Sequence, residues 1–357
     1  MNRFHRAARA VPFLALLIII GVAAPLHAAT YKIHWLLGHK NLDYFEEAAV
    51  SFKNAVEKGS NGDTSVDIKA QVADEPGHPG QTEVADKVAS GEAEMGHSFA
   101  DTLGGLDPQM YAFEAPFLFR GYRHVEGVVE GPVGAEMLAG LRAHGVVGLS
   151  FTYSGGASGI ATLERGVRRP EDLKGLKVAV FGDAVNAAWL QELGATAVPF
   201  GHDLEKLMPM TQARAIDAVA TTWRNFDRET ELGKEYKAVS LMGSTYLVSV
   251  TYVNPKFFDA LPKKYQELLA KASREAGRIE RARTIQLNES AKRGMTEDRG
   301  IEAVNLSQAN QRRFVEALRP AYRRAIEPLI GKALLEKIRK TADGPDFPSV
   351  PADLVKR

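Results

Sequence analysis

Residues 176–200 read LKVAVFGDAVNAAWLQELGATAVPF, and this stretch contains the unit that decides the fold. The apolar run at 176–181 predicts a short buried strand, and a helix follows through 187–193. Gly194 ends that helix, because glycine readily takes the left-handed conformation found after helices. A second strand is predicted at 197–200. Strand, helix and strand in this order are typical of a βα unit with a mostly parallel sheet.

The same alternation of strands and helices occurs twice along the chain. A first block is predicted at 31–36 (strand), 45–56 (helix), 66–72 (strand), 82–89 (helix) and 94–99 (strand). The second block continues after 197–200 with a helix at 204–213 and a strand at 215–220. With 357 residues the chain is too long for one ordinary core. We therefore expect an α/β protein with two lobes.

The C-terminal third has a different pattern. A helical spacing of apolar residues begins at Leu261-Pro262 and continues to Gly294 without a further proline and with Gly277 as its one internal glycine. Such a helix of more than 30 residues would be roughly 50 Å long, which is longer than one lobe. It is expected to span both lobes, because its apolar seam is not regular enough for a coiled coil. Two amphipathic helices are predicted at 308–330 and 333–341.

The first 29 residues have the layout of a secretory signal peptide. Arg3, Arg6 and Arg9 precede an apolar run at 11–24, and small residues close it at Ala28. The run is shorter than the ~20 residues that a membrane-spanning helix needs, so cleavage is expected rather than anchoring. No cysteine is present, which excludes a lipoprotein anchor and disulfides. The mature chain is predicted to lie in the periplasm and not to span the membrane itself.

Charge and motifs exclude several classes of function. Removing the signal peptide takes away three arginines and no acid, which leaves 42 basic against 44 acidic side chains. A near-neutral chain lacks the basic surface of a nucleic-acid-binding protein. There is no nucleophile elbow, P-loop or dinucleotide fingerprint, and the nine histidines show no metal-ligand spacing. We therefore expect no enzyme, no cofactor and no metal site.

A resemblance to a known family begins with the segment PFLFR at 116–120. Further matches follow in order: PEDLKGLKV at 170–178, LGA at 193–195 and Ile216-Asp217. Together they resemble the solute receptors of tripartite ATP-independent periplasmic (TRAP) transporters, of the dicarboxylate-receptor (DctP-like) type. Each motif is weak alone, but their order covers nearly the whole mature chain.

The resemblance implies a two-lobed periplasmic-binding-protein fold, the Venus flytrap, with a long helix across both lobes. It also implies a function: an extracytoplasmic receptor captures one small polar solute between its lobes and delivers it to a TRAP-type membrane permease. A receptor that reports to a membrane sensor kinase would have the same fold and stays an alternative. A secreted enzyme is the remaining alternative.

The lobe boundaries follow from the two blocks and the long helix. Lobe one is predicted to comprise 30–153 and 241–280, and lobe two 154–240 and 281–330. A C-terminal helix and tail would occupy 331–357. The hinge is expected near Ser154 and Ser240, and closure around the solute would exclude water.

The chain departs from the family at the carboxylate-binding arginine. The resemblance places that arginine at Ala179, and a second family arginine falls near Ala157-Ser158. Three interpretations remain open. Arg224 replaces the arginine, or the solute has no carboxylate, or the strand is misaligned by a residue or two. In the second case Phe181, Asp183 and Trp223 would offer an aromatic wall and a counter-charge to a neutral or cationic solute.

Candidate ligand-binding residues follow from their position beyond the strand ends, where open α/β sheets bind ligands. They are His39, Asn41, Phe99, Asp101, Phe181, Asp183, Phe200, Thr221, Trp223, Arg224, Asn225 and Tyr246.

Overall fold

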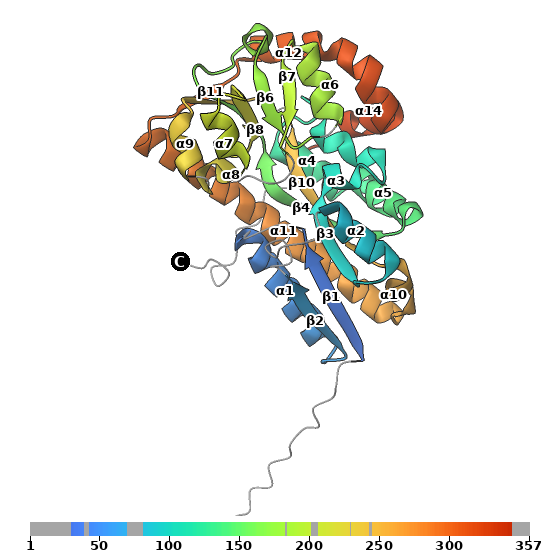
Figure 1. Cartoon of the computed structure of the whole chain (residues 1–357). Coiled ribbons are helices and arrows are strands. Elements are labelled where there is room, and N and C mark those ends of the chain that lie inside the picture. Colours follow the sequence, from blue (N-terminus) through green and yellow to red (C-terminus); the bar gives the residue numbers. More distant parts are fainter. Residues whose placement is uncertain are drawn as a thin grey trace, which may run out of the picture.

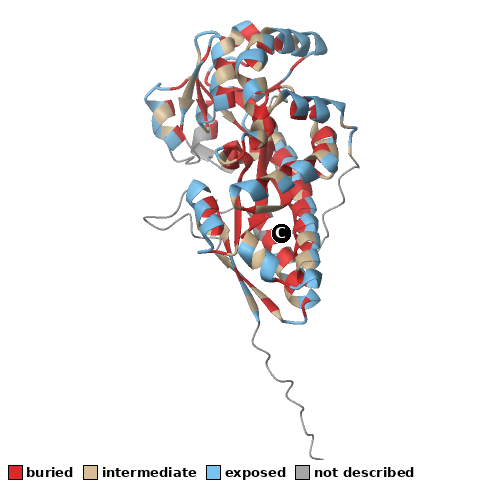
Figure 2. Cartoon of the chain, turned by 90° about the vertical axis from the view of Figure 1, so that its right-hand side faces the viewer, coloured by how far each residue is buried: buried red, intermediate tan, exposed pale blue. Residues whose placement is uncertain are grey.

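A computed structural model of the chain describes residues 30–38, 43–69, 81–182, 184–200, 206–228, 230–242 and 245–344. It contains two β-sheets with helices around them, one in each of two lobes (Figure 1). Buried residues run through the middle of the molecule from one lobe to the other (Figure 2). The predicted two-lobed α/β fold is therefore confirmed. The predicted signal peptide at 1–29 lies outside the described residues.

The sheet of the first lobe has the order β2-β1-β3-β10-β4. Its strands are β1 (Tyr31–Leu37), β2 (Thr64–Lys69), β3 (Met95–Phe99), β4 (Val147–Ala157) and β10 (Tyr246–Val253). β1 is parallel to β2 and β3, whereas β10 is antiparallel to both β3 and β4. Every residue of β10 is buried, so this strand has no alternation of exposed and buried positions to reveal it in the sequence.

The helices of the first lobe cover this sheet and carry its core. They are α1 (Asp43–Gly59), α2 (Gln81–Ser90), α3 (Ala100–Leu103), α4 (Tyr122–Val129), α5 (Pro132–Gly140) and α10 (Pro255–Ala260), with short 3-10 turns at Pro108–Glu114 and Leu141–His144. Trp35 of β1 packs edge-on against Phe45 and Phe52 of α1. The apolar side chains at the helical spacing within 45–56 thus lie in the core, as predicted.

The sheet of the second lobe has the order β11-β9-β5-β8-β6-β7. Its strands are β5 (Gly159–Thr162), β6 (Lys177–Val180), β7 (Thr196–Pro199), β8 (Ala218–Thr221), β9 (Ala238–Leu241) and β11 (Glu302–Asn305). β6 is parallel to β7 and β8, so the carboxyl ends of these three strands lie at one edge of the sheet. β5 is antiparallel to β8 and β9.

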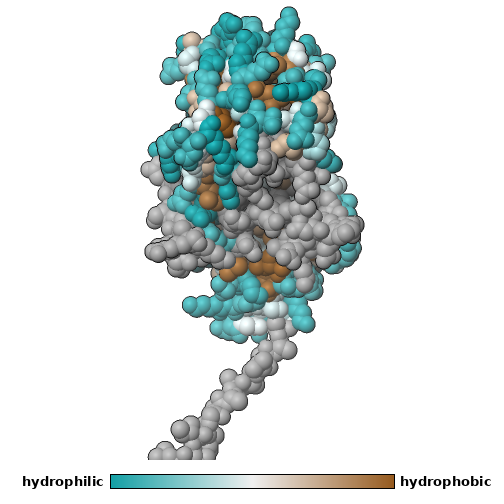
Figure 3. All heavy atoms as spheres, turned by 60° about the vertical axis from the view of Figure 1, so that its left-hand side comes forward, coloured by the Kyte–Doolittle hydropathy of each residue, from teal (hydrophilic) through white to brown (hydrophobic). Residues whose placement is uncertain are grey.

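Helices also surround the second sheet. They are α6 (Ala184–Glu192), α7 (Leu207–Gln212), α8 (Trp223–Arg228), α9 (Thr230–Glu235), α12 (Gln308–Ala321), α13 (Glu327–Ile330) and α14 (Lys332–Lys340), with a 3-10 turn at Pro170–Leu173. A π-turn at Tyr322–Ile326 joins α12 to α13. On the face shown in Figure 3 the outer end of this lobe is mostly hydrophilic, as expected of a surface in water.

The long helix α11 (Lys263–Arg293) crosses both lobes (Figure 1). It packs on α1 and β4 of the first lobe and on α8 of the second, and it has no glycine or proline except Gly277. A Cβ at Gly277 would lie 2.7 Å from the carbonyl oxygen of Phe151, so glycine permits the close approach of α11 to β4. The sequence had been interpreted as one uninterrupted helix, and that prediction is confirmed, although Gly277 lies inside it.

A buried ionic cluster joins α11 to α4 and β4. Arg281 is 1% exposed and donates two hydrogen bonds to Glu126, at 2.7 and 3.1 Å, and one to the Phe151 carbonyl oxygen. Glu130 accepts hydrogen bonds from both Arg281 and Arg278. Burial alone would raise the pKa of Glu130, but the two arginines lower it. The cluster thus pairs two arginines with two carboxylates.

The chain crosses between the two sheets three times, once along the long helix α11 between β10 and β11 and twice through short connections. The first crossing lies between β4 and β5, where Gly155 and Gly156 have φ angles of +136° and +70°. The second lies between Leu241 of β9 and Tyr246 of β10. At the first crossing the backbone N–H of Ala157 donates to the Tyr122 hydroxyl over 2.8 Å. The lobe boundaries given by the sequence stay a prediction.

Candidate functional site

The carboxyl edge of the second sheet brings several predicted residues together. Phe181 directly follows β6, Phe200 follows β7, and Thr221 ends β8. Because these strands are parallel, the three residues lie at the same edge, where α/β sheets bind ligands. Phe200 and Trp223 are buried in one apolar cluster, and Phe181 packs against it.

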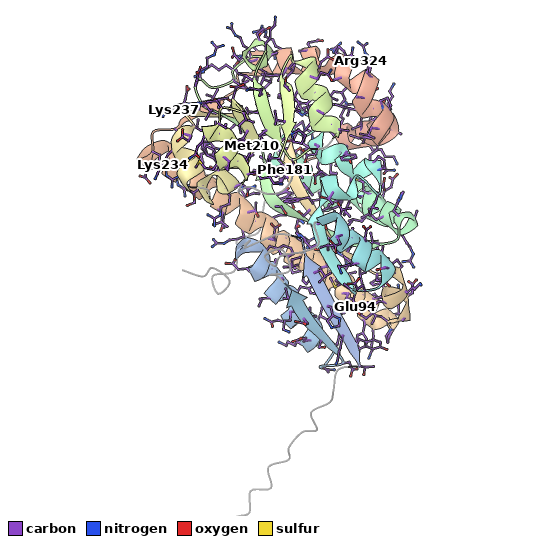
Figure 4. All side chains as sticks on the ribbon, viewed as in Figure 1. Glu94, Phe181, Met210, Lys234, Lys237 and Arg324 are labelled. Carbon is purple, nitrogen blue, oxygen red and sulfur yellow. The ribbon has the colours of Figure 1, made fainter. Side chains whose placement is uncertain are left out.

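An aromatic chain links this edge to the first lobe. The ring centroids of Phe99 and Phe181 are 6.0 Å apart, and those of Phe181 and Phe200 are 5.0 Å apart. Phe99 ends β3 of the first lobe, so the contact joins the two lobes. Figure 4 shows Phe181 near the centre of the molecule. The sequence predicted all three aromatic residues from their positions after strands.

Ala179 lies in the same apolar cluster and is fully buried. It lies on β6, two residues before Phe181, and Phe181 packs against the same cluster. Phe200 and Trp223 belong to that cluster as well. The position at which the family resemblance expects a carboxylate-binding arginine is therefore surrounded by apolar side chains.

Thr221 and Trp223 carry buried polar atoms without a partner. Both residues are buried, with 3% and 4% of their surface exposed. Among the described residues, neither the Thr221 Oγ1 nor the Trp223 Nε1 has a hydrogen-bond partner. A buried group left unsatisfied costs about 1–3 kcal/mol. Native proteins rarely leave such groups unpaired, so these two atoms need an explanation.

The first turn of α8 is fixed to both α11 and β4. The backbone N–H of Arg224 donates to Asn288 Oδ1 over 3.0 Å, and Asn288 Nδ2 donates to the Gly155 carbonyl oxygen over 2.5 Å. The backbone N–H of the buried Asn225 donates to Thr222 Oγ1. The start of α8, where Trp223 lies, is thus tied to α11 and to the end of β4. The role of Asn288 was not predicted from the sequence, because on the long helix it looks like any polar surface residue.

The guanidinium of Arg224 lies beside an acid of its own helix. Its Nη1 is 3.6 Å from Asp227 Oδ2, and Arg299 Nη2 lies 3.5 Å from the other oxygen of the same carboxylate. Two arginines thus flank Asp227. Arg224 is the residue that the sequence offers as a replacement for the carboxylate-binding arginine. Part of its positive charge is balanced by Asp227 within the protein.

Asp101 contributes an acid on the side of the first lobe. It lies in α3, directly after Phe99, and is 8% exposed. Its Oδ1 accepts a hydrogen bond from the Thr102 backbone N–H over 2.7 Å. Burial raises the pKa of Asp101 to about 6. The carboxyl therefore changes its charge at mildly acidic pH.

Four predicted residues remain, namely Tyr246, His39, Asn41 and Asp183. Tyr246 is buried in the core, with its ring edge-on to Phe119 and Tyr122, and burial raises the pKa of its hydroxyl. Its role as a ligand contact stays a prediction. His39, Asn41 and Asp183 lie outside the described residues.

A cavity of about 390 Å³ lies at a different place in the second lobe. Lys234, Tyr236, Lys237 and Arg299 line it together with the glycines at 233 and 300. Lys234 and Lys237 lie at the outer side of the lobe, away from Phe181 (Figure 4). In the described part of the chain, no cluster of three or more metal-ligating side chains occurs. No described helix is long and apolar enough to cross a membrane.

Comparison with known proteins gives a consistent result. The family model of "Bacterial extracellular solute-binding protein, family 7" (DctP) matches residues 38–328. The C4-dicarboxylate-binding protein DctB of Bacillus subtilis (strain 168) is 22% identical over 292 residues, 82% of this chain and 81% of that protein. The 2,3-diketo-L-gulonate-binding periplasmic protein YiaO of Escherichia coli (strain K12) is 26% identical over 235 residues, 65% of this chain and 68% of that protein.

The fold agrees with the sequence comparison. A TRAP periplasmic solute binding protein from a Polaromonas species, solved with bound D-erythronate, superimposes with a TM-score of 0.75 at 21% identity. The match covers 87% of this chain and 99% of that one. The resemblance inferred from short motifs is confirmed by a match over most of the sequence. This chain belongs to the bacterial extracellular solute-binding proteins of family 7.

Proposed function

We propose that this chain is the periplasmic receptor of a TRAP-type transporter. It takes up one small organic solute between its lobes and delivers it to a membrane permease, without changing the solute chemically. The family match carries this proposal. Relatives named for C4-dicarboxylate and 2,3-diketo-L-gulonate binding, and a TRAP receptor solved with D-erythronate, support it.

The geometry is consistent with binding between the lobes. Phe99 of the first lobe contacts Phe181 at the carboxyl edge of the second sheet, and the unpartnered atoms of Thr221 and Trp223 belong to that same edge. A solute bound there would touch both lobes and favour the closed arrangement by its differential affinity for it. The permease would then recognise the closed receptor.

Native mass spectrometry of the secreted, purified protein tests the receptor role. The expected result is a 1:1 complex that releases one small molecule on denaturation, and that molecule should raise the melting temperature when added back. Cells that lack this chain should then lose uptake of the same molecule. A protein that carries no solute, and that no member of a broad solute panel stabilises, would contradict the proposal.

A further inference from the structure

The two unpartnered polar atoms at the carboxyl edge point to the chemistry of the solute. Trp223 Nε1 can only donate a hydrogen bond, and the Thr221 hydroxyl can donate or accept one. Both are buried and have no partner among the described residues. Acceptor oxygens on a solute would satisfy such donors and remove the cost of leaving them unpaired. The edge is therefore a site for a hydrogen-bond acceptor.

The surroundings of these donors do not suit a carboxylate. Ala179 brings no charge to the cluster, and the Arg224 guanidinium shares Asp227 with Arg299. Moving an ionised carboxylate out of water onto neutral donors is far more costly than moving a carbonyl, hydroxyl or amide group. On the first lobe, Asp101 in α3 adds a negative charge two residues after Phe99 whenever its carboxyl is ionised. Charge thus favours an uncharged acceptor.

The chain of aromatic rings indicates a second property of the solute, which is apolar surface. Phe99, Phe181 and Phe200 present three rings from strand ends of both lobes. Phe99 and Phe200 are buried and Phe181 is half-buried, so a solute would meet mainly the side chain of Phe181. Apolar surface on a solute is buried favourably against such rings, at about 25 cal/mol per Å². A solute that consists only of hydroxyl and carboxylate groups would leave this wall unused.

We propose that the solute of this receptor carries an uncharged hydrogen-bond acceptor and an apolar body, rather than a carboxylate, at the second lobe. This inference rests on the receptor role proposed above and names its substrate class. Small amides, lactones and ketones with a hydrocarbon or ring body belong to it. The relatives compared above are named for, or hold, carboxylates, so the inference separates this chain from them.

Matched pairs of compounds that differ in charge test the substrate class. We would measure melting temperature and calorimetric affinity for phenylacetamide against phenylacetate, cyclohexanecarboxamide against cyclohexanecarboxylate, and galactono-1,4-lactone against galactonate. The neutral member of at least one pair should bind more than tenfold tighter than its acid. Tighter binding of an acid would leave the receptor role intact and overturn the substrate class. A panel without any binding, with a protein that also carries no solute, would overturn both.

Two tryptophan variants test the unpartnered donor directly. Trp223→Phe removes Nε1 and leaves a smaller ring in the buried cluster, so the solute-free protein should lose only the part of its melting temperature that comes from packing, while affinity for the neutral compound falls about three- to tenfold. Trp189→Phe is the matched control, because Trp189 Nε1 donates to Asn186 Oδ1 over 2.9 Å. It should lower the melting temperature and leave affinity unchanged.

Thr221→Val gives an independent reading of the second atom. The substitution replaces the hydroxyl with a methyl group and keeps the shape of the side chain. It should also reduce affinity for the neutral compound without lowering the melting temperature of the solute-free protein. If Trp223→Phe destabilises the protein as much as Trp189→Phe does, the Nε1 atom has a partner within the protein and the inference is wrong. Unchanged affinity in both Trp223→Phe and Thr221→Val would also overturn it.

Discussion

Glu280 is a fully buried carboxyl beside the ionic cluster around Arg281, and its charge is not required to balance the arginines of that cluster. Arg281 and Arg278 are already balanced by Glu126 and Glu130. Burial raises the pKa of Glu280 from its usual 4.5 to about 8. The Thr284 hydroxyl donates to one oxygen of Glu280 over 2.8 Å, and the Tyr153 backbone N–H donates to the other. The folded protein therefore holds a proton that the unfolded chain releases.

This proton predicts a pH dependence of stability. A group with a raised folded pKa stabilises the fold below its unfolded pKa, and this contribution is lost as pH rises from about 4.5 to about 8. Melting temperatures measured by calorimetry should therefore fall across this range. Glu280→Gln imitates the protonated form, because its amide can donate to Thr284, and should flatten the slope above pH 6. A variant with the same slope as the parent protein would contradict the assignment.

The part of the slope between pH 4 and 6 should survive in Glu280→Gln. Asp101 contributes there with the same sign, because burial raises its pKa from 3.8 to about 6.

The sequence could not predict the raised pKa of either carboxyl group, Glu280 or Asp101. Glu280 and Arg281 belong to a helix rich in charged residues, most of them exposed, and only the packing of β4 and α4 onto α11 buries these two.

Among the elements, the parallel βα units were predictable and the antiparallel strands were not. The helices α1, α2 and α6 and the strands β1, β3, β6 and β7 lie within a few residues of their predicted positions. β4, β5, β9, β10 and β11 were not assigned, because most of them are buried on both faces and show no alternation. The helical pattern at 308–330 was correct in extent, but the backbone widens into a π-turn just after Pro320.

The glycine pair at the end of β4 gives a prediction for the first crossing. Gly156→Ala should destabilise the protein strongly, because the backbone has φ +70° and the added Cβ would lie 2.6 Å from the Tyr122 hydroxyl. Gly300→Ala is the matched control, since Gly300 has φ +67° and nothing within 4 Å. The control should cost about 1–2 kcal/mol, which is the penalty of the left-handed conformation alone.

Chemical denaturation of both variants measures the difference between these two costs. Gly156→Ala is expected to be the more destabilised of the two, and its affinity for the solute should also change because Tyr122 is displaced from the Ala157 backbone N–H. Equal losses in Gly156→Ala and Gly300→Ala would show that the contact with Tyr122 adds nothing at this crossing.

For the molecule as a whole, the sequence predicted which aromatic residues meet near the carboxyl edge of the second sheet. It did not predict which polar atoms there lack a hydrogen-bond partner among the residues that the structure describes. Phe99, Phe181 and Phe200 were selected from their positions after strands, and the structure brings them into contact. The unpartnered state of Thr221 and Trp223 was not predictable, because it depends on every neighbour of the two atoms. The role of Asn288 at the start of α8 depends on the path of a helix that begins 25 residues earlier.

The shared helix also predicts how the two lobes unfold. Since α11 packs into both lobes, we expect one cooperative transition rather than two. Arg281→Leu leaves Glu126 buried without its partner and should lower the stability of the whole protein by about 3–5 kcal/mol. Calorimetry should show a single peak at a lower temperature. Adding Glu126→Gln should restore part of the loss, whereas two separate peaks would mean that the lobes unfold independently.

The position of β10 in the first sheet has a consequence for the timing of folding. β10 lies between β3 and β4, yet in the chain it follows all of β5–β9. A chain that emerges N-terminus first cannot complete its first sheet until residue 253 is available, and α11 comes later still. Closing so long a loop is slow, because its entropy is lost before the strand pairing compensates for it. The first sheet of the nascent chain thus stays incomplete for most of its synthesis, and its unpaired strands need protection until β10 arrives.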